Sequence, residues 1–303
     1  MNPIQHIINI QGFSRGEIDR ILDHAAQLEP IARGGVSDIL AGRILATLFY
    51  EPSTRTRLSF DVAMKRLGGD VIDFGPTDGS AVAKGENLAD TISVMEGYVD
   101  AIVLRHPREG AARMASEFSS VPVINAGDGA GQHPTQTLLD LYTIRKESKL
   151  NKVKIAIVGD LKYGRTVYSL THALSMYNAE IYLVSPDQLR MPDSMKRDLT
   201  NKGARITETG NLDDVIGMVD VLYITRIQRE RFPDPNEYQA VAGSYKITEK
   251  TLKDVRDDLI IMHPLPRVGE IDPGVDKSRH AVYFKQSFYG VPVRMAILSM
   301  VMG

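Results

Sequence analysis

Residues 51–57, with the sequence EPSTRTR, carry the side chains of an anion site. They follow a short apolar run and precede a helical pattern, and a helix start offers free backbone N–H groups and a dipole that favours negative charge. Three hydroxyl groups add donors, those of Ser53, Thr54 and Thr56. Arg55 and Arg57 add guanidinium groups suited to a phosphate or a carboxylate. Ser53 alone would be an ordinary helix cap, but the whole cluster favours an anion site.

Two further segments offer polar side chains at the ends of expected strands. Arg105 follows the apolar run 101–104, although alone it would be interpreted as a surface arginine before a turn proline. His133 and Gln136 lie at the start of an expected helix, whose first turn suits Pro134. The helix dipole favours the neutral imidazole there, and a neutral imidazole can donate one N–H to a carbonyl oxygen. From this segment alone, a capping histidine is an equally good interpretation.

Residues 263–267, HPLPR, follow an apolar run that ends at Met262. Two prolines remove backbone donors and stiffen the chain, so rigid carbonyl groups can accept hydrogen bonds from a ligand NH₂. A strand terminated by proline is the plain alternative. Residues 159–166, GDLKYGRT, nearly match a P-loop, but Arg165 replaces its lysine and the dinucleotide fingerprint is missing. We therefore expect Arg165 to bind a carboxylate rather than a nucleotide.

These segments must be positioned by alternating strands and helices. The strand candidates are residues 43–50, 71–74, 101–104, 121–124, 153–158, 181–184, 204–206, 219–224 and 259–262. Two helical patterns are the first and the last of the chain. The first begins at a capping box formed by Ser14 and Glu17, and the last covers residues 291–301. Strands separated by helices indicate parallel βαβ units, so we predict an α/β fold with two doubly wound domains and a boundary within residues 131–150. Ligands in such sheets bind beyond the carboxyl ends of the strands.

Composition narrows the class of protein further. The chain has 303 residues, 36 Lys and Arg against 38 Asp and Glu, and 43% hydrophobic residues. A net charge of −2 argues against a nucleic-acid binder, and no apolar run approaches the length of a membrane span. The absence of cysteine removes thiolate metal sites and cysteine nucleophiles. We expect a globular cytoplasmic protein.

Three of these motifs together resemble the aspartate/ornithine carbamoyltransferase family, and the resemblance runs from the first helix to the last. They are STRTR at residues 53–57, HPTQ at 133–136 and HPLP at 263–266. Within the family, three features favour the branch that acts on aspartate. Pro264 to Pro266 lack the cysteine typical of ornithine enzymes, Arg165 and Arg226 supply two cations for a dicarboxylate, and residues 80–86 contain a lysine loop.

The resemblance implies transfer of the carbamoyl group of carbamoyl phosphate to the α-amine of L-aspartate, an early committed step of pyrimidine biosynthesis. The phosphate is expected on Ser53, Thr54, Arg55 and Thr56. Arg105 would bridge phosphate and carbonyl, and His133 with Thr56 would polarise the carbonyl oxygen. The NH₂ group would be held by Gln136 and by the carbonyls of Pro264 and Leu265, with a cis bond before Pro266.

The second substrate, aspartate, is implied to bind through Arg165, Arg226, Gln228 and Lys84. Its neutral amine would attack the carbonyl, and phosphate would leave. Lys84 or the leaving phosphate would accept the amine proton, and both alternatives remain open. Because the mixed anhydride is already activated, positioning and charge stabilisation suffice, and neither a cofactor nor a metal is expected.

The resemblance also implies an organisation into domains and subunits. Residues 1–133 with 286–303 would form the carbamoyl phosphate-binding domain, onto which the C-terminal helix packs, and residues 134–285 the aspartate-binding domain. A homotrimer is expected, with Ser80 and Lys84 reaching the active site of a neighbour. Ion pairs of domain closure are assigned to Glu51, Arg231 and Glu237. A separate regulatory chain remains open as a partner, and any structural zinc would belong to it because this chain lacks cysteine.

Three alternative functions would each require a different feature of the sequence. A carbamoyltransferase for ornithine would conflict with two arginines facing a cationic substrate. An inactive homologue serving as a scaffold would have a broken site, whereas Arg55, Lys84, Arg105 and His133 are all in place. An NAD-dependent oxidoreductase would need a glycine-rich dinucleotide turn that the sequence lacks.

Overall fold

A computed structural model describes residues 4–74, 85–227, 232, 234–241, 243–253 and 255–303 of the chain. Contacts divide the chain into two compact units. The first unit comprises Met1–Leu139 and Phe288–Gly303, and the second comprises Asp140–Ser287. The second unit is thus inserted in the sequence of the first.

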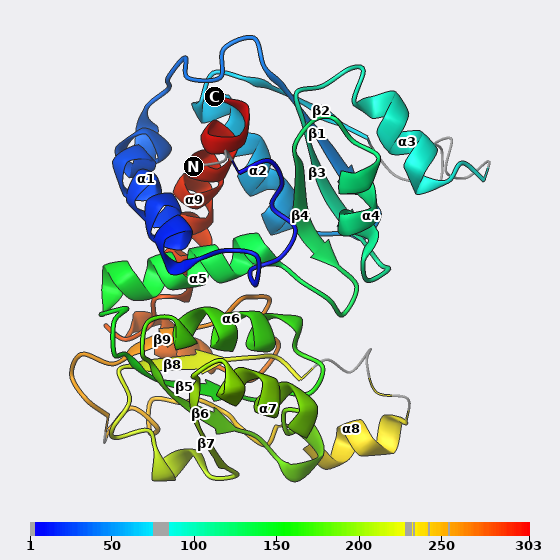
Figure 1. The fold of residues 1–303 in the computed structure, drawn as a ribbon. Coiled ribbons are helices and arrows are strands. Elements are labelled where there is room, and N and C mark those ends of the chain that lie inside the picture. Colours follow the sequence, from blue (N-terminus) through cyan, green and yellow to red (C-terminus); the bar gives the residue numbers. More distant parts are fainter. Residues whose placement is uncertain (1–3, 75–84, 228–231, 233, 242, 254) are drawn as a thin grey trace. The chain divides into compact units, whose positions relative to one another are not determined.

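The first unit contains a four-stranded parallel sheet with the order β2-β1-β3-β4. Its strands are β1 (Ile44–Phe49), β2 (Asp70–Asp73), β3 (Ala101–His106) and β4 (Val123–Asp128). Its helices are α1 (Arg15–Gly34), α2 (Thr54–Arg66), α3 (Leu88–Met95) and α4 (Ala111–Glu117). Helices α3 and α4 cover one face of the sheet and α2 the other (Figure 1). The predicted capping box is confirmed, because Ser14 and Glu17 each accept the other's backbone N–H.

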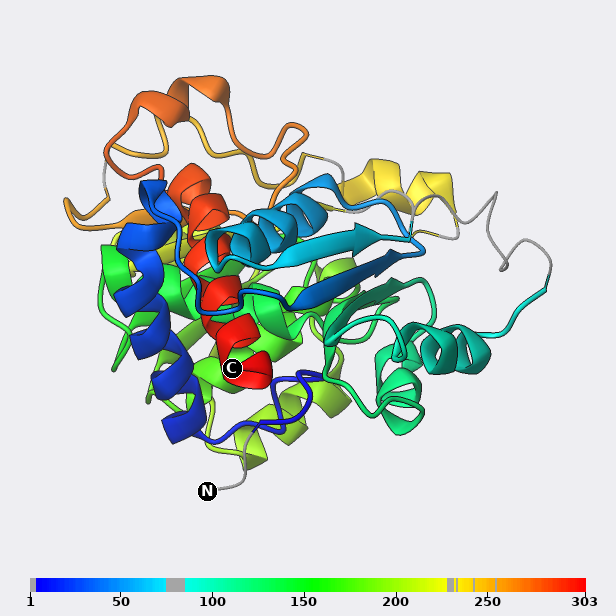
Figure 2. The same ribbon diagram turned by 90° about the horizontal axis from the view of Figure 1, so that it is seen from above.

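The C-terminal helix α9 (Tyr283–Met302) begins eight residues before the predicted start at 291. Pro292 lies inside it and removes only one backbone donor, while the residues around it are buried. Its C-terminal part packs on α1, where the guanidinium of Arg33 lies 4.8 Å from the ring centre of Phe288 and His24 Nε2 lies 2.8 Å from Ser299 Oγ. Figures 1 and 2 show the two helices side by side. The expected packing of the last helix on the first domain is confirmed.

The second unit contains a five-stranded parallel sheet with the order β7-β6-β5-β8-β9. Its strands are β5 (Lys154–Val158), β6 (Glu180–Val184), β7 (Arg205–Thr209), β8 (Val221–Ile224) and β9 (Ile260–Met262). Its helices are α6 (Arg165–Ser175), α7 (Asp193–Asn201) and α8 (Pro235–Val241), with short 3₁₀ turns at Asp187–Leu189, Leu212–Asp214 and Pro273–Lys277. Helix α5 (Pro134–Glu147) begins in the first unit and ends in the second. The predicted fold class, two doubly wound parallel sheets flanked by helices, is confirmed.

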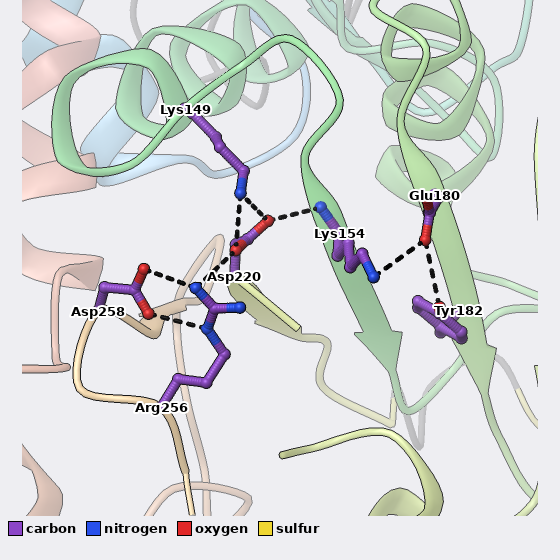
Figure 3. Close-up of polar contacts among 7 residues, drawn as sticks. All are labelled: Lys149, Lys154, Glu180, Tyr182, Asp220, Arg256 and Asp258. Atoms are coloured by element: carbon purple, nitrogen blue, oxygen red, sulfur yellow. Dashed lines mark hydrogen bonds and ion pairs between the residues drawn. The ribbon is translucent and has the colours of Figure 1, made fainter. Parts of the chain in front are cut away.

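Asp220 joins the amino ends of the three neighbouring strands β5, β8 and β9 (Figure 3). Its carboxylate accepts the backbone N–H of Lys154 at 2.9 Å and the ammonium of Lys149 at 3.1 Å. Its own N–H donates to the carbonyl of Lys154, and its carbonyl accepts the N–H of Ile260. The side chain is only 2% exposed, and the guanidinium of Arg256 lies 3.6 Å from it. The buried carboxylate stabilises the sheet because it satisfies the backbone N–H of Lys154 and is itself paired with two cations.

We expect Asp220→Asn to lower the free energy of unfolding by about 2 kcal/mol, because the amide loses the charge and turns an NH₂ group toward other donors. The midpoint of urea unfolding, followed by circular dichroism, measures the effect. Asp258→Asn is the matched control, since Asp258 also binds Arg256 but its side chain is 65% exposed. Equal shifts for the two variants would contradict the role given to Asp220.

Candidate active site

In the first unit, three predicted segments lie at the carboxyl edge of one sheet. Residues 51–53 follow β1, Arg105 belongs to β3, and His133 comes after β4. Phe49 at the end of β1 pairs with Arg105, which extends β3 beyond its predicted end at residue 104. Because all four strands are parallel, the loops after them share this edge.

The first turn of α2 is arranged for an anion. Ser53 is the N-cap residue, but its side chain makes no capping hydrogen bond. Thr56 is buried, and Arg55 forms no ion pair with any other described residue. Partial burial lowers the pKa of the Arg55 guanidinium from its ordinary value, and the group remains a cation at neutral pH. Arg57 differs, because its guanidinium is ion-paired with Asp73 at the end of β2. The interpretation of Arg57 as a second anion ligand is therefore replaced by this ion pair.

Arg105 is largely enclosed within the first unit. One guanidinium nitrogen donates to the carbonyl of Ala126 at 3.1 Å, and another lies 3.4 Å from the carboxylate of Glu51. Glu51, expected as a residue of domain closure, thus contacts a cation of its own unit. Arg105 lies at the end of β3 and Glu51 follows the neighbouring strand β1, which explains why they meet.

His133 is buried and precedes the first residue of α5. Its carbonyl accepts the N–H groups of Gln136 and Thr137, so His133 lies in the capping position while Pro134 opens the helix as predicted. Gln136 lies in the first turn of the same helix. The main chain therefore fixes the positions of both side chains relative to the sheet edge.

Asp128, which the sequence did not single out, anchors the loop before His133. Its carboxylate accepts the N–H of Gln132 at 2.7 Å and of Gly110 at 2.9 Å. Gly129 has a φ of 52°, and a Cβ there would lie 2.6 Å from the carbonyl oxygen of Pro107. This loop and the loop after Arg105 are thus packed together. The signal in the sequence was an aspartate at a strand end, between Gly127 and Gly129.

In the second unit, the ends of β5 and β8 are tied together by Thr225. Its hydroxyl donates to the carbonyl of Val158 at 3.0 Å and accepts the N–H of Asp160 at 2.9 Å. Gly159 has a φ of 117° and lies so close that a Cβ would be 2.5 Å from the carbonyl oxygen of Thr225. Arg226 follows Thr225 directly and is half-buried. Arg165 is the first residue of α6, so the backbones that carry both arginines leave adjacent strands at one edge.

The segment after β9 has an unusual backbone. The Leu265–Pro266 peptide bond is cis, as the resemblance to the family implies, and Leu265 has a φ of 56°. His263 is buried, and its Nδ1 accepts the N–H of Leu265 at 2.8 Å. Its Nε2 lies 2.6 Å from the carboxylate of Glu270. The ring therefore connects the carboxylate to the residue whose carbonyl is expected to bind substrate.

Glu270 is a functional candidate that sequence reasoning missed. Burial alone would raise the pKa of its carboxyl group, but hydrogen bonds from His263 and from the N–H groups of Val268 and Gly269 outweigh burial and lower the pKa to about 2. The carboxylate is thus ionised at neutral pH and can only accept hydrogen bonds. The histidine seven residues upstream was the only signal in the sequence.

Several predicted site residues lie outside the described part of the chain, namely Ser80, Lys84, Gln228 and Arg231. Arg165 and Glu237 are described by their backbone alone, Glu237 within α8. The described residues contain no group of three or more His, Asp or Glu side chains placed to hold a metal ion. Among the same residues, none of the helices has the length and apolar content needed to cross a membrane.

Comparison with known proteins decides the family. The model of the aspartate/ornithine carbamoyltransferase carbamoyl-P binding domain matches residues 5–146, and that of the Asp/Orn binding domain matches residues 151–301. The chain belongs to the aspartate/ornithine carbamoyltransferase family. The family predicted from the three sequence motifs is thereby confirmed.

Relatives in this family match the chain over nearly its whole length. It is 65% identical over 298 residues to the aspartate carbamoyltransferase catalytic subunit of Methanothrix thermoacetophila, covering 98% of each chain. The catalytic subunit of M. jannaschii aspartate transcarbamoylase is 58% identical, with a TM-score of 0.91 and coverage of 98% of each chain. Aspartate transcarbamoylase from Trypanosoma cruzi, solved in complex with carbamoyl phosphate and aspartate, is 41% identical, with a TM-score of 0.93 over 99% of this chain and 97% of that chain.

The low pKa of Glu270 predicts a pH-dependent contribution to stability. Since its pKa of about 2 lies below the ordinary value of 4.5, the stabilising effect is complete above pH ~5 and declines as the pH falls from ~4.5 toward ~2. The difference in unfolding midpoint between the wild type and Glu270→Gln should therefore be constant near neutrality and shrink in acid. Urea titrations between about pH 7 and pH 3 measure it. A difference that stays constant down to about pH 3 would contradict the prediction.

Proposed function

We infer that the chain transfers the carbamoyl group of carbamoyl phosphate to the α-amine of L-aspartate, producing N-carbamoyl-L-aspartate and phosphate. One observation carries this inference above the others: the chain aligns from end to end with enzymes named for this reaction, one of them solved with both substrates. The product contains a carbamoyl group next to an aspartate skeleton, which suits a supply of pyrimidine precursors.

We assign carbamoyl phosphate to the carboxyl edge of the first sheet. Ser53, Thr54, Arg55 and Thr56 bind the phosphate, which is supported by the uncapped N-terminus of α2 and by the absence of an ion pair at Arg55 among the described residues. Arg105 bridges the phosphate and the carbonyl, His133 and Thr56 polarise the carbonyl oxygen, and Gln136 holds the NH₂ group. In the second unit, the carbonyls of Pro264 and Leu265 accept hydrogen bonds from the same NH₂.

Aspartate is assigned to the second unit. Arg165 and Arg226 bind its two carboxylates, supported by the adjacent strand ends from which their backbones leave. Gln228 and Lys84 complete the site in this proposal. The neutral amine attacks the carbonyl carbon, the bond to the bridging oxygen breaks, and phosphate leaves with the electron pair. The amine proton passes to Lys84 or to the departing phosphate.

Domain roles follow these assignments. We propose residues 1–133 with 286–303 as the carbamoyl phosphate domain and residues 134–285 as the aspartate domain. Both divisions lie within a few residues of the two compact units. Glu51, Arg231 and Glu237 keep their predicted role in closure.

A homotrimer with shared sites is the proposed assembly. The described surface exposes Leu58 and Val62 of α2 with Ile72 of β2, and separately Val94 of α3 with Tyr98 after it. Two different apolar surfaces on one chain suit a heterologous contact, which closes into a ring. The segment between β2 and α3 holds Ser80 and Lys84, which would reach the neighbour's site. The relatives are named catalytic subunits, which supports a separate regulatory chain as a further partner in the cytoplasm.

The function is tested by offering L-aspartate and L-ornithine separately with carbamoyl phosphate and measuring both carbamoylated products. We expect carbamoyl-aspartate alone. Arg55→Ala should lose several orders of magnitude in turnover, because the cation that binds the phosphate is removed. Arg57→Ala is the matched control and should retain most activity, since Arg57 is already paired with Asp73. Citrulline as the product, or equal losses in the two variants, would contradict these assignments.

Shared sites predict complementation between inactive variants. Lys84→Gln and Arg55→Ala should each be inactive, but in mixed trimers some sites would combine Arg55 of one chain with Lys84 of its neighbour. Activity should therefore return after the subunits are exchanged, to about a quarter of the wild type or more. Each variant exchanged with itself is the control. Exchange confirmed by mass spectrometry without recovered activity would contradict shared sites.

A further inference from the structure

We propose that Glu270 and His263 are positioning residues that make the substrate site select an amide NH₂ over a methyl group, by fixing the backbone carbonyl of Pro264, which shares a peptide group with the N–H of Leu265. The inference rests on the proposed function, which assigns this carbonyl to the carbamoyl NH₂. It adds two residues that do not themselves touch substrate. It also gives the reason why carbamoyl phosphate would be preferred over acyl phosphates of the same shape.

The hydrogen bonds of His263 determine which ring nitrogen carries the proton. The backbone N–H of Leu265 is a donor and lies 2.8 Å from Nδ1, so Nδ1 must accept. Nε2 must then carry the hydrogen and donate it to the carboxylate of Glu270 at 2.6 Å. The other oxygen of Glu270 accepts the N–H groups of Val268 and Gly269 at 3.0 and 2.9 Å. The carboxylate of Glu270 thus orients the ring of His263, and the ring in turn holds the N–H of Leu265.

This arrangement holds Leu265 in a conformation that leucine rarely adopts. A φ of 56° lies in the left-handed region, which is unfavourable for a residue with a Cβ and persists only where the surroundings hold it. The N–H of Leu265 is held by His263, and the plane of the peptide group before it is thereby oriented. Loss of this hydrogen bond would let the peptide group that carries the Pro264 carbonyl turn away from its position.

The segment that follows β9 begins at His263, and this residue is held in place by contacts that do not involve Glu270. The N–H of His263 donates to the side-chain oxygen of Gln286 at 2.9 Å, and Gln286 donates to Asp140 at 2.7 Å. Tyr223 donates to the other oxygen of Asp140 at 2.8 Å, and all four residues are buried. A change at Glu270 should therefore alter the orientation of Leu265 while the segment stays in place.

Selectivity follows from the chemistry of the acceptor. A carbonyl oxygen accepts a hydrogen bond from NH₂ but not from a methyl group of nearly the same size. A site built around such an acceptor rejects a ligand that leaves it unpaired. A stable pair of ligands isolates this contrast: phosphonoacetamide, with NH₂ on its carbonyl, and acetonylphosphonate, with CH₃ in its place.

Three substitutions separate positioning from general stability. In Glu270→Gln, either orientation of the amide brings two donors together. Its NH₂ group faces the N–H groups of Val268 and Gly269 in one orientation and the N–H of the His263 ring in the other. His263→Gln can still reach Glu270 but lacks an acceptor near Leu265. His263→Asn places an oxygen where Nδ1 was and retains that acceptor. Glu208→Gln is the matched control, because Glu208 is a similarly enclosed, ion-paired carboxylate on β7, with 22% of its side chain exposed against 13% for Glu270.

The test measures binding of both phosphonates and of inorganic phosphate to the full-length assembled protein by calorimetry, with no aspartate present. Glu270→Gln and His263→Gln should lower the preference for phosphonoacetamide over acetonylphosphonate by roughly 3- to 10-fold. Phosphate affinity should change less than about twofold, because the phosphate is assigned to the first unit. His263→Asn and Glu208→Gln should retain most of the preference.

Each other outcome overturns a different statement. Equal weakening of all three ligands would show a general structural effect, and an unchanged preference in Glu270→Gln would show no role for the carboxylate; both overturn the inference. An equal loss of the preference for phosphonoacetamide in His263→Asn and His263→Gln would also overturn the inference. If the expected binding pattern appears but the wild type forms no carbamoyl-aspartate, the proposed acceptor amine is wrong while the inference stands.

Discussion

Parallel pairing of the strands is the constraint on which the candidate site depends. In both sheets every described pair is parallel, so each connection must return to the same amino edge before the next strand begins. All loops that follow strands are thereby collected at the opposite edge. Residues far apart in the sequence, such as Arg55, Arg105 and His133, share an edge because of this pairing and for no other reason.

Within each edge, close contacts of the backbone determine which loops touch. Gly129 packs against the carbonyl of Pro107, and Gly159 against that of Thr225, at distances that leave no room for a Cβ. At both positions the residue also has a positive φ, which glycine tolerates at little cost. The two glycines therefore bring neighbouring loops into contact.

The sequence was sufficient for the fold class and the family because alternation of apolar runs with helical patterns and three motifs are local signals. It was insufficient where side chains are decided by distant partners. Arg55 and Arg57 are equivalent in the sequence, yet only Arg57 meets Asp73. Strand β4 extends to Asp128 because Asn125, polar but buried, donates to the carbonyl of Ile8 and accepts the N–H of Gly127. Glu270 escaped notice because its importance comes from the ring of His263, and neither charge nor spacing reveals that contact.

The insertion of one unit within the other affects how the protein is made. The first unit includes α9 from Phe288 onward, and the contact between His24 and Ser299 joins residues 275 positions apart. A ribosome releases the amino end first, so the strands of the first unit emerge long before the helix that covers them. During that interval the second unit can fold, because it is one continuous stretch of chain. The first unit can complete its fold only after the last helix has been synthesised. Premature termination within the last helix would thus leave a folded middle and an incomplete beginning.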